Sequence, residues 1–304
     1  MWTLLAFISA LCLGCYDISK KIALRDNRVV DVLTISICFS ALLLSVPLLL
    51  SRICPDLLMD TPFYVPSLDL QAHLFTLLKS AIVLSSWVFA YISLKHLPLS
   101  VVSPMQATRP MWTLIGALLI FHEHLSPMQW TGVLLAIGSI FIFSFHPHRS
   151  VAPKLHSSSL HIYYVCLALS ILIGACSGLY DKYLMRRYDH NAVQVYYTLY
   201  QAVMMLIVWV IINRKNLTPY TIHLPQIKNI EVIVLISIFL IISDNVYMLA
   251  LRDPDSMIAV VSTIRRGGAV IGFAYGLIFL HEPDPWRKLA CMAGICAGLI
   301  CLAI

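Results

Sequence analysis

The stretch VVSTIRRGGAVIGFAYGLIFLHE, residues 260–282, decides the organisation of the chain, because its pattern occurs twice. Residues 101–123 read VVSPMQATRPMWTLIGALLIFHE, so that Val-Val-Ser and His-Glu recur 159 positions apart. GCYDISKK (14–21) and GLYDKYLMRR (178–187) form a second matching pair, 164 positions apart. The sequence therefore predicts two copies of one unit, residues 1–147 and 160–304, with a polar link over 146–161.

Composition places both units in a membrane. The 304 residues are 60% hydrophobic and 12% charged, and the mean hydropathy of +0.84 is outside the range of soluble globular domains. Ten apolar stretches are each long enough to cross a hydrocarbon core of roughly 30 Å as a helix. They lie near residues 2–20, 31–50, 74–94, 99–121, 128–145, 161–184, 192–212, 230–251, 256–280 and 286–304. No basic segment precedes the first stretch, so we expect it to remain as a span and not to be removed as a signal peptide.

Five spans in each unit fix how the two units are related. An odd number forces the second unit to enter the membrane in the opposite direction. The fold class expected is thus an all-α polytopic membrane protein, with ten transmembrane helices in two inverted five-helix repeats. Secondary transporters use this architecture, with the binding site near the midplane between the halves. The partners expected are a small-molecule substrate and the lipid bilayer, and the chain would act as a monomer or homodimer.

The charges bear on orientation and on the classes of partner. If the N-terminus were cytoplasmic, most basic residues near span ends would face outward, so the positive-inside rule favours both termini outside. The smaller, inward-facing group would contain Arg52, Lys79, Arg186, Arg187 and Arg252. The net charge of +6 includes no basic block, which gives no case for nucleic acid. No P-loop is present, so transport is expected to run on gradients without a cofactor.

The end of each unit carries a family resemblance. LLIFHEHLSPMQWTGVLLAIGSIFIF (118–143) and LIFLHEPDPWRKLACMAGICAGLICL (277–302) are small-residue-rich spans that follow a His-Glu pair. They look like the end of an EamA domain, so the chain resembles the ten-helix drug/metabolite transporter superfamily over nearly its whole length. The resemblance implies transport and a cytoplasmic N-terminus, against the charge count, and it leaves orientation and substrate open.

Arginines lie deep in two matching spans. A span that begins near residue 257 places Arg265 about 12 Å into the bilayer at about 1.5 Å per residue, and Arg109 lies at a similar depth in the fourth span. A central arginine costs roughly 2.5–3.5 kcal/mol, so Arg109, Arg265 and Arg266 should face a water-filled cavity or pair with acids. The 159-residue offset aligns Arg109 with Gly268, and proline in one copy and glycine in the other weaken the same helix.

Broken spans at matching positions predict a transporter site, and guanidinium groups there favour an anionic or amphipathic substrate. The sugar-phosphate translocator branch of the superfamily looks similar here, with basic residues on its fourth and ninth spans binding phosphate. That resemblance implies the same role for Arg109 and for Arg265 or Arg266.

Acidic and aromatic residues complete the predicted site. Asp17 and Asp181, at repeat-related positions, are candidates for proton coupling or for counter-ions to the arginines. The alternative is that both aspartates are solvated near helix ends, with Asp17 paired to Lys20 or Lys21. Asp244 and Asn245 lie in the middle of the eighth span and are the next candidates for a polar lining. Substrate stacking is expected of Trp87, Tyr200 and Tyr247, although aromatic side chains in spans more often pack or anchor at the interface.

The sequence His122-Glu123-His124 raises an alternative function. A membrane-embedded enzyme acting on a lipid-linked substrate would need His122, Glu123 and Asp284 to meet over a groove, whereas a sensor or scaffold would have no central cavity. Neither the histidines nor the acids form a closed ligand set, so no metal site is expected. Glu123 and Glu282 are expected to begin the turn into the following span. The prediction is a secondary transporter, multi-pass in the plasma (inner) membrane, that moves a small organic metabolite by alternating access.

Overall fold

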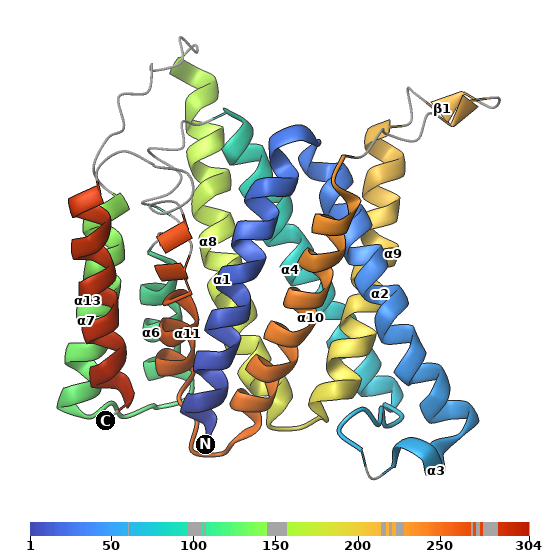
Figure 1. Cartoon of the computed structure of the whole chain (residues 1–304), viewed down its shortest axis with the longest axis horizontal. Coiled ribbons are helices and arrows are strands. Elements are labelled where there is room, and N and C mark those ends of the chain that lie inside the picture. Colours follow the sequence, from blue (N-terminus) through green and yellow to red (C-terminus); the bar gives the residue numbers. More distant parts are fainter. Residues whose placement is uncertain are drawn as a thin grey trace.

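A computed structural model gives the fold. It describes residues 1–59, 61–96, 105, 108–144, 157–213, 217–218, 221–222, 228–268, 270–271, 274–275 and 285–303. Within these residues nearly all regular structure is helical (Figure 1). The helices are α1 (Trp2–Asp26), α2 (Val29–Ile53), α3 (Pro55–Leu58), α4 (Leu70–His96), α6 (Arg109–Ile120), α7 (Pro127–Ser144), α8 (Ser157–Met185), α9 (His190–Asn213), α10 (Ile230–Arg252), α11 (Ile258–Arg266) and α13 (Pro285–Ala303). Two short antiparallel strands, β1 (Leu217–Thr218) and β2 (Thr221–Ile222), form a hairpin between α9 and α10.

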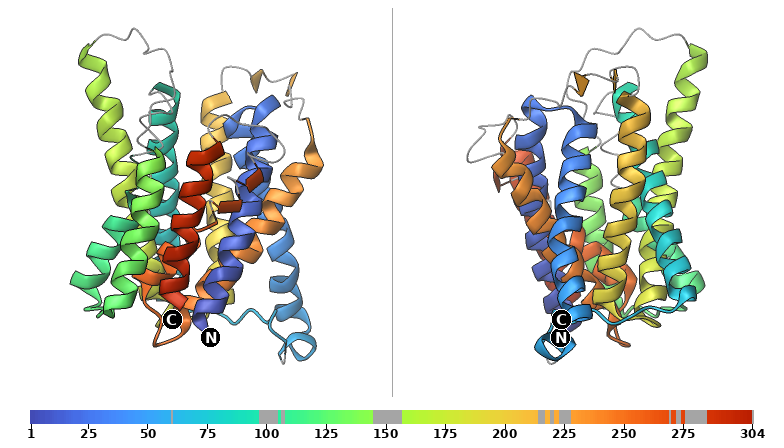
Figure 2. Two further views of the ribbon diagram at one scale, coloured as in Figure 1. Left: turned by 60° about the vertical axis from the view of Figure 1, so that its left-hand side comes forward. Right: turned by 90° about the vertical axis from the view of Figure 1, so that its right-hand side faces the viewer.

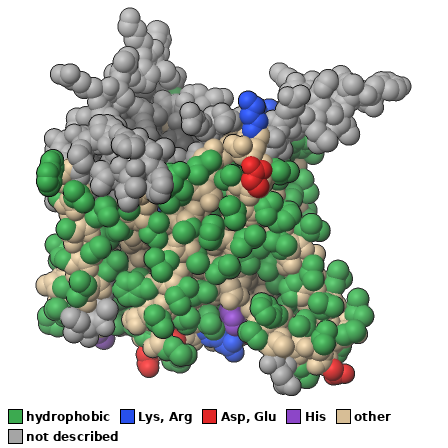
Figure 3. All heavy atoms as spheres, viewed as in Figure 1, with side chains coloured by type: hydrophobic (Ala, Val, Ile, Leu, Met, Phe, Trp, Pro, Cys, Tyr) green, Lys and Arg blue, Asp and Glu red, His purple; other side chains and the backbone are tan. Residues whose placement is uncertain are grey.

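The helices form a polytopic membrane protein. Six of them, α1, α2, α4, α8, α9 and α10, are long and apolar enough to cross a bilayer. The other helices that coincide with predicted spans are α6, α7, α11 and α13, while Asp284 and the His-Glu pair at 281–282 lie outside the described residues. Figure 3 shows apolar side chains over the middle of the molecule, with the coloured charged groups near its two ends. This distribution is the one that a bilayer imposes on a bundle of spanning helices.

Each long helix packs against a partner from the other half of the chain. α1 packs against α10, α4 against α8, α2 against α9 and α7 against α13. α6 contacts α8 and α11, and α11 contacts α1. α1 and α8 run in opposite directions, while α1 begins and α13 ends at the same end of the molecule (Figures 1 and 2).

Small hydroxyl side chains join the paired helices at close range. Ser9 on α1 donates to the Ser243 carbonyl oxygen at 2.8 Å, and Ser243 donates back to the Ser9 carbonyl oxygen at 3.0 Å. Ser86 on α4 donates to the Ser170 carbonyl oxygen of α8 at 2.8 Å. Serine allows this approach because its small side chain satisfies its own hydroxyl without separating the helices. The polar groups described next are therefore held in a tightly packed frame.

Candidate functional site

A lysine inside the bundle forms the first buried ion pair. Lys79 on α4 donates to Asp181 on α8, and their side chains are 3% and 11% exposed. The Lys79 Nζ also lies 4.5 Å from the ring centroid of Tyr197 on α9. The expectation that Lys79 is a charge at a span edge was wrong, because this residue lies well inside α4 and is buried. Asp181 is a candidate counter-ion for the arginines, but its direct partner is this lysine.

The second buried ion pair links two consecutive helices of the second half. Arg265, in the last turn of α11, donates through Nη2 to Asp244 in α10, and the two side chains are 19% and 17% exposed. The Arg265 guanidinium also lies 4.2 Å from the ring centroid of Tyr247, a cation–π contact that strengthens when the groups are desolvated. Its Nε is buried and has no hydrogen-bond partner among the described residues.

The two pairs belong to one cluster. The charge of Asp181 acts on Arg265 and on Asp244, so the four ionised groups are within electrostatic reach of one another. The two tyrosine rings that receive the cations, Tyr197 and Tyr247, are 7% and 5% exposed. We call the side chains Lys79, Asp181, Tyr197, Asp244, Tyr247 and Arg265 the charge cluster. Its members come from both halves of the chain.

Two further arginines lie beside the charge cluster. Arg109, at the start of α6, packs its guanidinium against Gly174 of α8, where a Cβ would lie 2.6 Å from the Arg109 Nε. Arg266 is exposed, unlike Arg265, and its charge acts on Arg109 and on the exposed Asp17 of α1. Adjacent residues on a helix point about 100° apart, which explains why Arg265 alone reaches Asp244.

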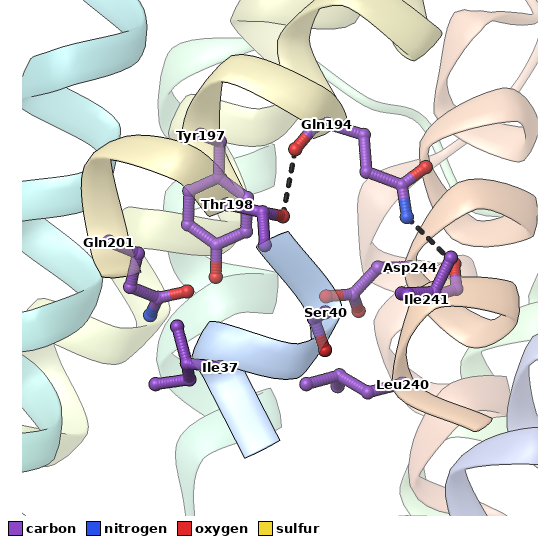
Figure 4. Close-up of a pocket in the computed structure, with 9 residues that line it drawn as sticks. All are labelled: Ile37, Ser40, Gln194, Tyr197, Thr198, Gln201, Leu240, Ile241 and Asp244. Carbon is purple, nitrogen blue, oxygen red and sulfur yellow. Dashed lines mark hydrogen bonds between the residues drawn. The ribbon is translucent and has the colours of Figure 1, made fainter. Parts of the chain in front are cut away.

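A pocket opens beside Asp244 (Figure 4). Its cavity volume of about 10 Å³ gives room for roughly one group the size of a water molecule. Residues from α2, α9 and α10 line it: Ile37, Ser40, Gln194, Tyr197, Thr198, Gln201, Leu240, Ile241 and Asp244. Asp244 and Tyr197 thus belong both to this pocket and to the charge cluster.

The remaining predicted lining residues are placed differently. Asn245 donates to the side-chain oxygens of Asn191 at 2.9 Å and of Gln194 at 2.8 Å. It therefore holds the lining residue Gln194 in place without lining the pocket itself. Trp87 packs in an apolar cluster with Ile37 and Leu84. Tyr200 shares a hydrogen bond of 2.8 Å with Nδ1 of His73. The contacts of Trp87 and Tyr200 therefore lie outside the charge cluster.

Several residues of this site were not predicted from the sequence. A lysine inside an apolar span is itself a functional signal, so Lys79 could have been found by position alone. Gln194 and Gln201 lie seven positions apart on α9 and hence on one helix face. Ser40 and Thr198 carried no such signal, because serine and threonine occur throughout the spans.

Glu123 has a structural role outside the charge cluster. Its two carboxylate oxygens accept hydrogen bonds from the backbone N–H groups of Ile258, at 2.7 Å, and Ala259, at 3.2 Å. The carboxylate therefore caps the start of α11, a helix of the other half. Burial raises the pKa of Glu123, although the two N–H donors act in the opposite direction. Among the described residues, no group of three His, Cys, Asp or Glu side chains could hold a metal ion.

Comparisons with known proteins bear on the fold and on the family. Residues 1–145 match the EamA-like transporter family. A solved structure, described as a crystal structure of a protein, superposes with a TM-score of 0.74 over 99% of this chain and 95% of that one. The two sequences are 11% identical, so this likeness concerns the fold alone. No curated protein matches the chain.

Proposed function

We propose that this chain, whose residues 1–145 match the EamA-like transporter family, moves a small organic compound that carries an anionic group across the membrane by alternating access. The observation that carries the proposal is the balance of charge inside the bundle. Three basic side chains lie among two acidic ones: Lys79, Arg109 and Arg265 with Asp181 and Asp244. One positive charge is left over in a desolvated region, and a bound anion would neutralise it.

Repeat-related contacts support the inverted arrangement of two five-helix halves. The packing of α1 on α10 corresponds to that of α8 on α4, and the contact of α11 with α1 corresponds to that of α6 with α8. At residue level, Arg109 of the first half packs on Gly174 of the second, while Gly268 of the second half packs on the Ala10 carbonyl oxygen of the first. The sequence offsets of 159 and 164 relate these two contacts. The same helix crossing therefore occurs twice, once with a large residue and once with a small one.

The position of the site supports alternating access. Lys79 and Arg109 come from the first half, and Asp181, Asp244 and Arg265 come from the second. Rocking one half against the other would change the contacts between these groups and expose them to each side of the membrane in turn. Glu123 joins the two halves by capping α11. During such a motion, either its hydrogen bonds to α11 would break or Glu123 would move together with α11.

Metabolite profiling tests the proposal even though the substrate is unidentified. Wild type and Arg265→Gln are reconstituted into liposomes loaded with a metabolite extract, and the released compounds are identified by mass spectrometry. We expect wild-type vesicles to lose or exchange a small set of organic anions that the variant retains. If no compound differs between the two preparations, or if the differing compounds carry no acidic group, the anion proposal is wrong.

A further inference from the structure

We propose that the pocket between α2, α9 and α10 receives an ammonium group, so that the substrate is a zwitterion whose anionic end binds Arg265 and whose cationic end binds Asp244. This inference rests on the proposed transport function and narrows its substrate class. Asp244 is the central residue, because it lines the pocket and is also the partner of Arg265.

The lining of the pocket favours a group that donates hydrogen bonds. Its nine residues include one carboxylate and no basic side chain. The hydroxyl groups of Ser40 and Thr198 donate to carbonyl oxygens of their own helices at 2.9 and 2.8 Å, so they offer lone pairs to the pocket. Asp244 is bonded to Arg265 through Oδ1, and a carboxylate can accept further hydrogen bonds at its other oxygen. An ammonium group, with three donors and no acceptor, matches this set.

A buried amide in the same pocket has a donor without a partner. Gln201 is 3% exposed, and its Nε2 has no hydrogen-bond partner among the described residues. Figure 4 shows the Gln201 amide among the lining side chains, with its oxygen on the side of the Tyr197 hydroxyl and its nitrogen on the other side. Because buried polar groups are nearly always paired, the free donor of Gln201 marks a place for an acceptor atom of the substrate, which is an atom other than the ammonium nitrogen.

The other amide in the lining has a partner at both its nitrogen and its oxygen. Gln194 donates to the Ile241 carbonyl oxygen at 2.7 Å and accepts from Asn245. The two glutamines of the pocket therefore differ in role, since Gln194 fixes the wall and Gln201 is left to meet the ligand.

The ion pair itself selects against a simple anion. An anion that bound Arg265 would compete with Asp244 and leave this carboxylate without its partner in a desolvated site, which is strongly unfavourable. A zwitterion avoids this cost, because its ammonium group replaces Arg265 as the partner of Asp244 while its anionic group binds Arg265. The Nε of Arg265 has no hydrogen-bond partner among the described residues, so it is a further donor for the anionic end. The Arg265–Asp244 pair thus offers one binding group for each charge of a zwitterion.

Competitive retention by the purified protein tests the inference. The protein in detergent is incubated with an equimolar mixture of three matched sets: 4-aminobutanoate, butanoate and butylamine; phenylalanine, 3-phenylpropanoate and 2-phenylethylamine; and phosphoethanolamine, ethyl phosphate and ethylamine. After rapid gel filtration, the retained compounds are quantified by mass spectrometry. The variants are Asp244→Asn, Gln201→Leu and Arg265→Gln. Asp31→Asn is the control, because Asp31 is also a buried aspartate but accepts from Trp209 at 2.9 Å outside this site.

We expect wild type and Asp31→Asn to retain at least one zwitterion about tenfold more than its two single-charge analogues. Asp244→Asn should lose this preference and retain the matched anion, Gln201→Leu should retain the zwitterion less well, and Arg265→Gln should retain neither. Each variant must elute as wild type does, which separates loss of the site from loss of folding. Retention of plain anions by wild type, with unchanged selectivity in Asp244→Asn, would overturn the zwitterion and leave anion transport standing. Wild-type retention of cations alone, or of no compound in the mixture, would overturn both.

Discussion

Lys79 on α4 and Asp181 on α8 form an ion pair that is almost completely enclosed by the bundle. The pair joins the two halves of the chain, because α4 belongs to the first and α8 to the second. A buried pair of this kind is weak evidence for stability, since the desolvation of both charges offsets their attraction. Its value here is positional: it holds Asp181 in one geometry beside Tyr197 and the Arg265–Asp244 pair.

Removing one partner of this pair should destabilise the protein. Lys79→Met or Asp181→Leu would leave an uncompensated buried charge, and each should lower the free energy of unfolding by about 3–5 kcal/mol. The double variant Lys79→Met/Asp181→Leu should recover most of that loss. Unfolding in mixed micelles, followed by circular dichroism, gives the double-mutant cycle. Additive effects in the double variant would show that the two residues do not interact.

Transport should depend on Arg265 specifically, and loss of an arginine elsewhere in the chain should not abolish it. Arg265→Gln removes the cation that holds Asp244 and is expected to reduce substrate flux to the background of empty vesicles. Arg252→Gln is the control, because Arg252 is half exposed at a helix end and binds Asp189. Both variants should insert into the membrane at wild-type levels. Wild-type flux in Arg265→Gln would rule out the proposed role of this residue.

The space beside Arg109 gives a matched pair of glycine variants. In Gly174→Ala the new Cβ would collide with the Arg109 guanidinium, so we expect displacement of Arg109 and a severalfold or larger fall in flux. Gly138→Ala places a Cβ where no atom lies within 4 Å, and it should keep full flux. It should also stabilise α7 by about 0.5–1 kcal/mol, because alanine favours a helix interior over glycine. Equal flux in the two variants would contradict the contact.

Asp189 should make stability depend on pH. It caps α9 by accepting from the Asn191 N–H at 2.9 Å, and it also accepts from Arg252 at 3.1 Å. Burial raises the pKa of Asp189, but hydrogen bonds from His190 and from the Ala192 N–H outweigh burial, so the pKa is lowered. A lowered carboxyl pKa stabilises the fold above the unfolded value of about 3.9 and loses that effect as pH falls through the folded value.

The corresponding measurement is the melting temperature of wild type and Asp189→Ala as a function of pH. At neutral pH the variant should be less stable by about 1–2 kcal/mol. The difference should narrow as the pH is lowered below about 3.9. A difference that stays constant down to acid pH would mean that ionisation of Asp189 has no part in the cap.

Loss of the Glu123 cap should loosen the start of α11. Glu123→Ala removes the acceptor of the Ile258 and Ala259 N–H groups, so hydrogen exchange in this segment should accelerate and stability should fall by about 1 kcal/mol. His124→Ala is the control, because His124 is exposed next to Glu123. Unchanged exchange at 258–259 in Glu123→Ala would show that the cap does not hold α11.

The sequence predicted the fold far better than the site. Apolar length and spacing located the spans, since both are local properties of a helix in a bilayer. The arginines were selected because a charge inside an apolar run is costly wherever it points. The aromatic candidates fared differently: Tyr247 contacts Arg265, whereas Tyr200 bonds His73 and Trp87 packs among aliphatic side chains. No local pattern separates these outcomes, because they depend on how each helix is rotated in the bundle.

By itself the sequence determined that the chain is a multi-pass membrane protein with a repeated pattern and charges inside its spans. Hydropathy and repeats are properties of the sequence and do not depend on which helices are in contact, so they can be recognised without the structure. Tertiary structure alone decided that Arg265 meets Asp244 while Arg266 points away, that Lys79 meets Asp181, and that Gln201 keeps a free donor among the described residues. These pairings join groups on different helices, and helix packing sets which faces come together.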